Sequence, residues 1–308
     1  MAGERFHAFD SLRAAAMLLG IFFHASLAYV DPPQTYWIVQ DESRSLGFGA
    51  FAWASHSFRM QLFFVMAGFF ARLLLDRYGA RRFARHRMVR VALPFGVGIL
   101  LDNAIQQSFL HFTFAAGVVI PDSVATARSA ALPLSASNYL QHFSLGIYWF
   151  LEYLLCFSMI AWVWRWAPPS ASVARIHGAL DRSFASLVRS AWKPWLLAVP
   201  TAALLSFDDQ WGVGSPAGLL PQALWLGYYG LFFAFGWALN RYPDLLGDLT
   251  GTGNRDGALA IGVGAIALGG AVATPTPRPA AVRQMRSNLR RSFRVSSFAL
   301  QLRNAGAR

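Results

Sequence analysis

The chain has 308 residues, of which 55% are hydrophobic and 14% charged. Soluble domains average about 25% charged and about 45–50% apolar residues, so this chain carries more apolar surface than one soluble core buries. The composition therefore excludes an ordinary soluble protein and predicts an integral membrane protein in contact with lipid.

The net charge is +12, and every basic residue except Lys193 is arginine. Nucleic-acid-binding proteins gather basic residues on a soluble face with aromatic stacking platforms. Here the arginines lie between apolar runs, which is typical of topology signals facing anionic lipid. We therefore predict no nucleic-acid partner. The single cysteine, Cys156, excludes an intrachain disulfide and a CxxC metal site.

Seven apolar stretches approach the length of about 17 to 20 residues that a membrane-spanning helix requires. They cover residues 14–30, 60–75, 91–112, 143–166, 194–207, 219–240 and 258–274. The predicted fold is therefore an all-α, polytopic transmembrane helix bundle of about seven spans. The fifth stretch is short and contains Pro194 and Pro200, which restrict its helix.

The distribution of arginine predicts the orientation of these spans. The loop 72–90 carries seven arginines against Asp76 alone, a net charge of +6, and the positive-inside rule assigns it to the cytoplasm. If successive spans alternate in direction, the basic segments fall on the cytoplasmic side through the first six spans. A seventh span would then place the arginine-rich end on the extracytoplasmic side, against the positive-inside rule. We therefore expect a membrane domain at 1–274 that lacks its last helices, and a disordered, non-native tail at 275–308.

The N-terminal segment also allows a second interpretation. Arg13, the apolar run 14–23 and the Ser26-Leu27-Ala28 triplet are similar to a secretory signal with its cleavage site. Cleavage there would remove His24 from the mature protein. The acidic Asp10 so close to the apolar run favours a retained span instead.

His24 lies in the first span and Arg13 directly before it, and an ionisable group at membrane depth costs about 2.5 to 3.5 kcal/mol and indicates a function by default. Arg13 and His24 are eleven residues apart, so on a helix they point within about 20° of each other, about 16 Å apart. Asp10, one turn earlier, can hold the Arg13 guanidinium. We predict His24 as a general base, since an ordinary imidazole pKa near about 6.5 leaves it ready to accept a hydroxyl proton. The alternative is a histidine that only packs against a neighbouring helix.

Further polar residues are predicted to bind substrate. His56 and Arg59 lie one turn apart at the outer end of the second span, and Trp149 and Glu152 share a face of the fourth. For Arg59, the alternative is snorkelling to the interface.

Arg87 and Arg90 present forked donors that match phosphate, although topology alone also explains them. The remaining histidines show no two-histidine spacing, so we predict no metal site. Motifs of nucleotide-binding proteins, serine hydrolases and zinc proteases are absent from the sequence.

Five segments resemble the integral-membrane acyltransferase family 3, and within it the glucan-biosynthesis branch. They are FDSLRAAAMLLGIFFH (9–24), FRMQLFFVMAGFF (58–70), RMVRVALP (87–94), YWFLEYLL (148–155) and YYGLFFAFGWAL (228–239). The first two are specific, because an arginine followed by ten residues and a histidine is the family's hallmark. The segments occur in the family's order over about 240 residues.

The resemblance implies a multi-pass enzyme of the bacterial inner membrane. It implies transfer of an acyl group, succinyl in the glucan branch, from acyl-coenzyme A as donor substrate to a hydroxyl of an extracytoplasmic glycan, without a permanently bound cofactor. His24 would be the general base and Arg13 its partner in the hallmark. Arg87 and Arg90 would contact the donor, while Arg59 and Trp149 match motif positions of less defined role.

The chain departs from the family pattern in three respects. Ile147 stands where the family usually has histidine, and Ala67 where it usually has serine. The family has about ten spans, so seven spans and a basic tail imply a truncated product. Two other functions stay open: a non-enzymatic carrier of a lipid-linked or anionic solute, and a scaffold whose polar residues only specify helix packing.

Overall fold

The computed structural model describes residues 7–31, 37, 40–115, 143–165, 182–190, 192–208, 215–216, 218–242 and 244–245. The chain divides into two compact units, Met1–Gly262 and Val263–Arg308, and the described residues belong to the first. The predicted seventh span, 258–274, and the arginine-rich tail, 275–308, lie outside the described residues.

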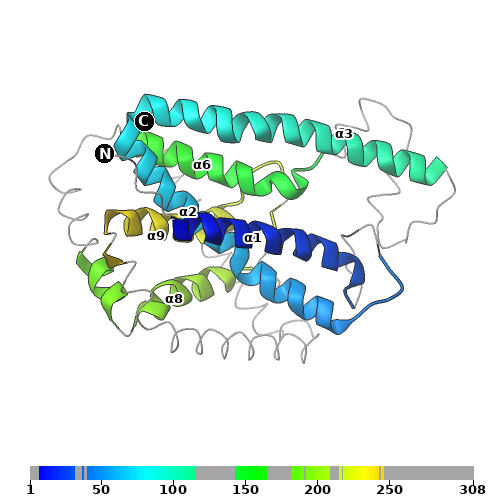
Figure 1. The fold of residues 1–308 in the computed structure, drawn as a ribbon, viewed down its shortest axis with the longest axis horizontal. Helices are drawn as coiled ribbons and strands as arrows, with labels where there is room; N and C mark the ends of the chain where they lie inside the picture. The colour runs from blue at the N-terminus through cyan, green and yellow to red at the C-terminus, as the bar shows by residue number, and fades with distance from the viewer. Residues whose placement is uncertain are drawn as a thin grey trace, which may run out of the picture. The chain divides into compact units, whose positions relative to one another are not determined.

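The described part of the chain is built from helices (Figure 1). In chain order these are α1 (His7–Ser26), η1 (Leu27–Tyr29), α2 (Leu46–Arg87), η2 (Met88–Ala92), α3 (Leu93–Ala115), η3 (Gly146–Tyr148), α6 (Trp149–Trp164), α8 (Lys193–Leu205) and α9 (Ala223–Arg241). Within these ranges no strand forms, and an isolated bridge pairs Val30 with Ser45 at the turn from α1 to α2. The all-α prediction is confirmed for this part.

Three helical segments among the described residues are long and apolar enough to cross a membrane: Phe9–Tyr29, Leu46–Phe109 and Gly146–Trp164. The second contains the predicted second span and most of the third, because the chain between them is also helical apart from an interruption at Gly79. The predicted fifth span forms α8, which has 13 residues and is shorter than a span requires. The protein is therefore a helical membrane protein, while the total of seven spans stays a prediction.

The basic segment 72–90 is helical, and its prediction as a loop was wrong. α2 continues through it to Arg87 with one interruption at Gly79, whose φ of 75° lies in the left-handed region that favours glycine. A π-helical turn, η2, then leads into α3. Figure 1 shows α3 running back in the opposite sense to α2. Arginine is a good helix former, so a cluster of arginines is compatible with the helix seen on either side of Gly79.

Two glycines bring α2 and α9 into close contact. A Cβ atom added at Gly68 would overlap the carbonyl oxygen of Phe233, and one added at Gly236 would overlap that of Val65. Each helix therefore lies against the bare backbone of the other, as small residues permit in membrane proteins. Nearby, the buried side-chain amide of Gln61 donates to the Tyr228 hydroxyl at 2.7 Å.

Aromatic side chains from α2, α6 and α9 form the centre of the fold. The Tyr229 ring lies 4.8 Å from Phe64, 5.0 Å from Trp149 and 6.1 Å from Tyr153 between ring centroids. All four side chains are buried. Aromatic pairs at these distances add to the free energy gained from burial, so this cluster fixes the three helices together.

Asn103 fastens α3 to the segment that enters η3. Its amide nitrogen donates to the carbonyl oxygens of Ile99 and Ser144, both at 2.8 Å, and its amide oxygen accepts from the Ser144 N–H at 3.0 Å. The side chain is 6% exposed, so these three hydrogen bonds satisfy groups that water does not reach.

Replacing Asn103 with aspartate should therefore lower the free energy of unfolding by about 1–3 kcal/mol. The carboxylate keeps the acceptor but loses both donors and turns an oxygen toward two carbonyl groups. Thermal unfolding of the purified protein in detergent measures this change. An unchanged melting temperature would contradict the assignment of Asn103 as the link between α3 and η3.

Candidate functional site

The last turn of α1 places His24 beside α2. His24 is half-buried, and its Nδ1 atom is fully buried without a hydrogen-bond partner in the part of the chain that the structure describes. One face of the imidazole stacks on Trp37, with ring centroids 5.9 Å apart. The Nδ1 edge of the ring therefore faces the protein interior.

Arg59 on α2 lies close to this imidazole, since both side chains contact Phe23. Its side chain is 5% exposed, and its Cζ atom lies 4.4 Å from the centre of the Phe23 ring. Nη1 has no hydrogen-bond partner among the described residues. Gly20 on α1 leaves space for this group, since a Cβ there would lie 3.4 Å from Nη1.

His56, one turn before Arg59, completes the group of polar side chains. Its ring stacks on Phe23 with centroids 5.2 Å apart and an interplanar angle of 16°. Its Nε2 atom lies 3.4 Å from the Ser215 hydroxyl oxygen, from a part of the chain just before α9. The sequence placed His24, His56 and Arg59 on two separate spans, and the structure brings all three around Phe23. We call these four residues the His24 cluster.

Arg13 and Asp10 do not belong to the His24 cluster. They form an ion pair of 3.7 Å at the start of α1, with side chains 53% and 62% exposed. α1 is one helix from His7 to Ser26, so Arg13 stays about 16 Å along the axis from His24. The expected Asp10–Arg13 pair is present, but the guanidinium beside the imidazole belongs to Arg59.

The two candidates on α6 lie in different surroundings. Trp149 is 5% exposed and packs within the aromatic centre against Tyr153 and Tyr229. Glu152 is half-buried, and its Oε2 atom is buried without a hydrogen-bond partner among the described residues. Trp149 thus has a packing role that the sequence did not reveal, whereas Glu152 keeps an unsatisfied polar atom.

The predicted donor-binding arginines lie at the junction of α2 and η2. The Arg87 guanidinium lies 5.1 Å above the Phe83 ring, and its Nε and Nη2 atoms are buried without partners within the described ranges. Arg90 is exposed. This arrangement leaves forked N–H donors available for an oxyanion such as phosphate.

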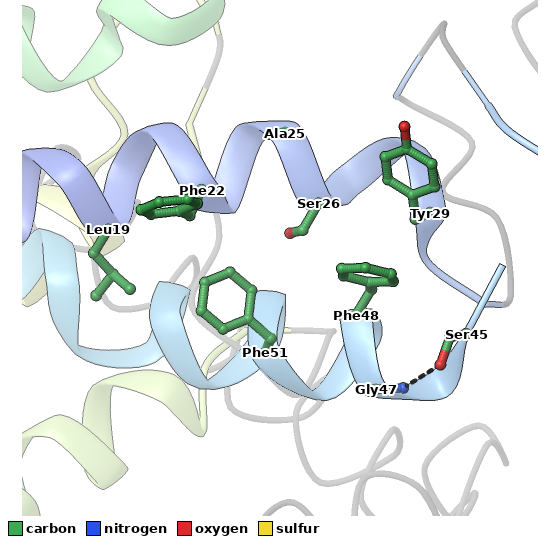
Figure 2. A pocket seen from close by; sticks show the side chains of 9 residues that line it. All are labelled: Leu19, Phe22, Ala25, Ser26, Tyr29, Ser45, Gly47, Phe48 and Phe51. Atoms are coloured by element: carbon green, nitrogen blue, oxygen red, sulfur yellow. Dashed lines mark hydrogen bonds between the residues drawn. The ribbon is translucent and has the colours of Figure 1, made fainter. Parts of the chain in front are cut away.

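A groove of about 600 Å³ runs between α1 and the start of α2 (Figure 2). The Phe22 and Tyr29 rings from the first helical segment and the Phe48 and Phe51 rings from α2 line it. The Ser45 hydroxyl at its end accepts from the Gly47 N–H at 3.1 Å and caps α2. Phe22 lies two residues from His24 and projects from the opposite side of α1, so the groove does not include the His24 cluster.

Sequence reasoning missed three residues beside the predicted ones: Phe23, Trp37 and Ser215. Phe23 is the direct neighbour of His24, but an apolar residue in an apolar span gives no signal of its own. Trp37 and Ser215 reach the cluster from connecting segments, whose course periodicity does not predict. Among the described residues, no group of three histidine, cysteine, aspartate or glutamate side chains is placed to hold a metal ion.

Comparison with known proteins matches most of this chain to one family. The profile of a family described as an acyltransferase domain matches residues 6–282. Glucans biosynthesis protein C of Escherichia coli strain K12 is 41% identical over 109 residues, which cover 35% of this chain and 28% of that protein. Its namesakes in the O1:K1 / APEC and SMS-3-5 strains match with the same identity and coverage.

The match thus spans less than a third of the length of these curated relatives. No solved structure matches the chain. The family profile nevertheless covers most of the sequence, including every helix described above. Its span includes the hallmark arginine and histidine of α1. The chain therefore belongs to acyltransferase family 3 and is a helical membrane protein with an acyltransferase domain.

Proposed function

We propose that this protein is an O-acyltransferase of a bacterial inner membrane. It moves an acyl group from acyl-coenzyme A to a hydroxyl of an extracytoplasmic glycan. The observation that carries the proposal is the His24 cluster, in which a buried imidazole atom and a buried guanidinium atom lie close together and both lack hydrogen-bond partners among the described residues. Family membership and relatives named for glucan biosynthesis support the same reaction class.

The proposed reaction needs no covalent intermediate on the enzyme. His24 accepts the proton of a glycan hydroxyl as its oxygen attacks the carbonyl carbon of the thioester. The tetrahedral intermediate collapses, the carbon–sulfur bond breaks, and the thiolate of coenzyme A takes the proton back from the imidazolium. An ester on the glycan and free coenzyme A are the products.

Arg59 is the group proposed to stabilise the oxyanion of this intermediate. A donor that is fixed before the reaction and shielded from water stabilises developing charge far better than a solvated one. Arg59 fits both conditions, since its guanidinium packs on the Phe23 ring and its side chain is 5% exposed. Its Nη1 atom is not engaged by a described residue. Arg13 is less suited, because its side chain is 53% exposed and already paired with Asp10.

The donor is proposed to bind first at the junction of α2 and η2. Arg87 offers Nε and Nη2 to a phosphate of coenzyme A, and the exposed Arg90 lies less than one turn further along the chain. The thioester then reaches the His24 cluster through the membrane domain. By analogy with the glucan branch, the acyl group is succinyl.

Reconstitution of the full chain in lipid vesicles tests this function. Acyl-coenzyme A labelled in the acyl group is supplied on the side of Arg87, and a glucan on the side of His24. Mass spectrometry should detect labelled esters on the glucan, and parallel reactions with succinyl-, acetyl- and longer acyl donors identify the group transferred. Absence of labelled glucan with every donor, from protein shown to be folded, would contradict the proposal.

A carrier function is the second candidate, because Glu152 adds another unsatisfied polar atom in an apolar span. Unpaired ionisable groups inside a membrane mark solute paths as well as catalytic sites. Counterflow of an anionic sugar lipid or dicarboxylate in vesicles without coenzyme A would favour the carrier. Transfer that depends strictly on acyl-coenzyme A would exclude it as the main activity.

A further inference from the structure

Phe23 is the one member of the His24 cluster without a polar atom, yet it contacts the other three. Its ring lies edge-on to His24, with centroids 4.9 Å apart, and stacks on His56 at 5.2 Å. The Arg59 guanidinium carbon lies 4.4 Å from the same ring centre. The side chain is 7% exposed, so these contacts form away from solvent.

Burying the Arg59 guanidinium costs free energy, and the Phe23 ring compensates part of this cost. An isolated buried charge is costly, and proteins usually compensate it with an opposite charge. No ion pair of Arg59 is recorded among the described residues, and Asp10 and Asp76 pair with Arg13 and Arg72 instead. The contact recorded for its charged carbon is with the Phe23 ring, 4.4 Å from the ring centre.

A ring and a carboxylate compensate a guanidinium in different ways. A carboxylate takes up two N–H donors in the guanidinium plane, whereas the negative face of an aromatic ring attracts the cation as a whole. The donors of a guanidinium that lies over a ring therefore stay free for a third group. The unbonded Nη1 of Arg59 fits this description.

We propose that Phe23 is a positioning residue that holds Arg59 next to His24 while leaving its N–H donors free for the substrate. An acid in place of this ring would compensate the charge but occupy the donors that bind the oxyanion. This inference rests on the acyl transfer proposed above, in which Arg59 stabilises the tetrahedral intermediate. Phe23 itself transfers no proton and forms no bond in the proposed reaction.

Kinetics of four variants test the assignment. Phe23→Leu removes the ring with a modest change in volume, and Phe23→Tyr keeps the ring. Because a desolvated cation–π contact is worth up to about 2 kcal/mol, we expect Phe23→Leu to lower kcat by about 5- to 30-fold with little change in KM. Phe23→Tyr should retain most of the activity. Phe22→Leu is the matched control, since Phe22 is 64% exposed on the opposite side of α1.

The fourth variant, Arg59→Gln, separates positioning from general packing. If Phe23 acts through Arg59, adding Phe23→Leu to Arg59→Gln should change kcat by less than about 2-fold, because the contact is already lost. Losses that multiply in the double variant would overturn the proposal. So would a Phe23→Tyr variant as impaired as Phe23→Leu.

Thermal unfolding of the same variants gives a readout that does not depend on catalysis. The falls in melting temperature for Phe23→Leu and Arg59→Gln should sum to more than the fall in the double variant. If the wild type transfers no acyl group, acyl transfer fails as the function, and this thermal cycle decides alone whether Phe23 holds Arg59. Additive falls would then reject the contact, and non-additive falls would support it.

Discussion

Replacing His24 with glutamine should reduce acyl transfer by about 10²- to 10⁴-fold, which is the range that a positioned general base contributes. Glutamine has a similar reach and can hydrogen-bond, but it does not accept a proton at neutral pH. The substrate hydroxyl would then attack without a base. Initial rates of ester formation on the glucan, measured at saturating acyl-coenzyme A, give the size of the loss.

His111→Gln is the matched control for this substitution. His111 lies on α3 with its ring against Phe112, and it contributes nothing to the His24 cluster. The control should keep the wild-type rate, and both variants should unfold at temperatures close to that of the wild type. A His24→Gln protein that is folded and transfers acyl groups at the wild-type rate would remove the imidazole from the mechanism.

Gly68→Ala should have the largest effect on stability, because the added methyl group meets backbone and not a side chain that can move aside. Its Cβ would overlap the carbonyl oxygen of Phe233, so α2 and α9 would have to separate. Overpacking of a well-filled core costs about 1–3 kcal/mol, and a clash with backbone belongs at the upper end of that range or above it. The yield of monodisperse protein in detergent and its melting temperature measure the loss.

Two further glycine variants make this prediction specific. Gly236→Ala adds a methyl group on the other side of the same contact, so the double variant should lose less stability than the sum of the single losses. Gly96→Ala on α3 is the matched control, since a Cβ there meets no atom within 4 Å. It should be neutral or stabilising, because alanine favours helix by about 1 kcal/mol. Equal losses at Gly68 and Gly96 would show that the helix crossing plays no special part.

The helices were predictable because each one depends on the residues of its own short stretch of sequence. Apolar stretches of span length appear in the sequence, and the structure places α1 and α6 where two of them were expected. The basic segment before α3 was misread as a loop because clustered arginines report which side of the membrane they face. They do not report whether the backbone is helical. The break at Gly79 was visible only as one glycine among many.

The candidate site was predictable only in part. His24 and Arg59 were found because ionisable side chains are rare and costly in apolar spans. The sequence could not reveal that Arg59, and not Arg13, lies beside His24, since contacts between spans depend on how each helix rotates about its axis. For the same reason the sequence did not reveal that the Trp149 ring packs in the aromatic centre with Tyr229, and its role in substrate binding stays a prediction.

The glycine contact between α2 and α9 bears on chemistry as well as on stability. Gly68 and Arg59 are nine residues apart on one unbroken stretch of α2, which places them about 180° apart around its axis. α9 therefore packs against one face of α2, while Arg59 extends from the opposite face toward α1. The proposed position of Arg59 therefore depends in part on a close glycine contact on the other face of α2. If Arg59 acts as proposed, we expect substitutions along α9 that alter this contact to change the rate of acyl transfer.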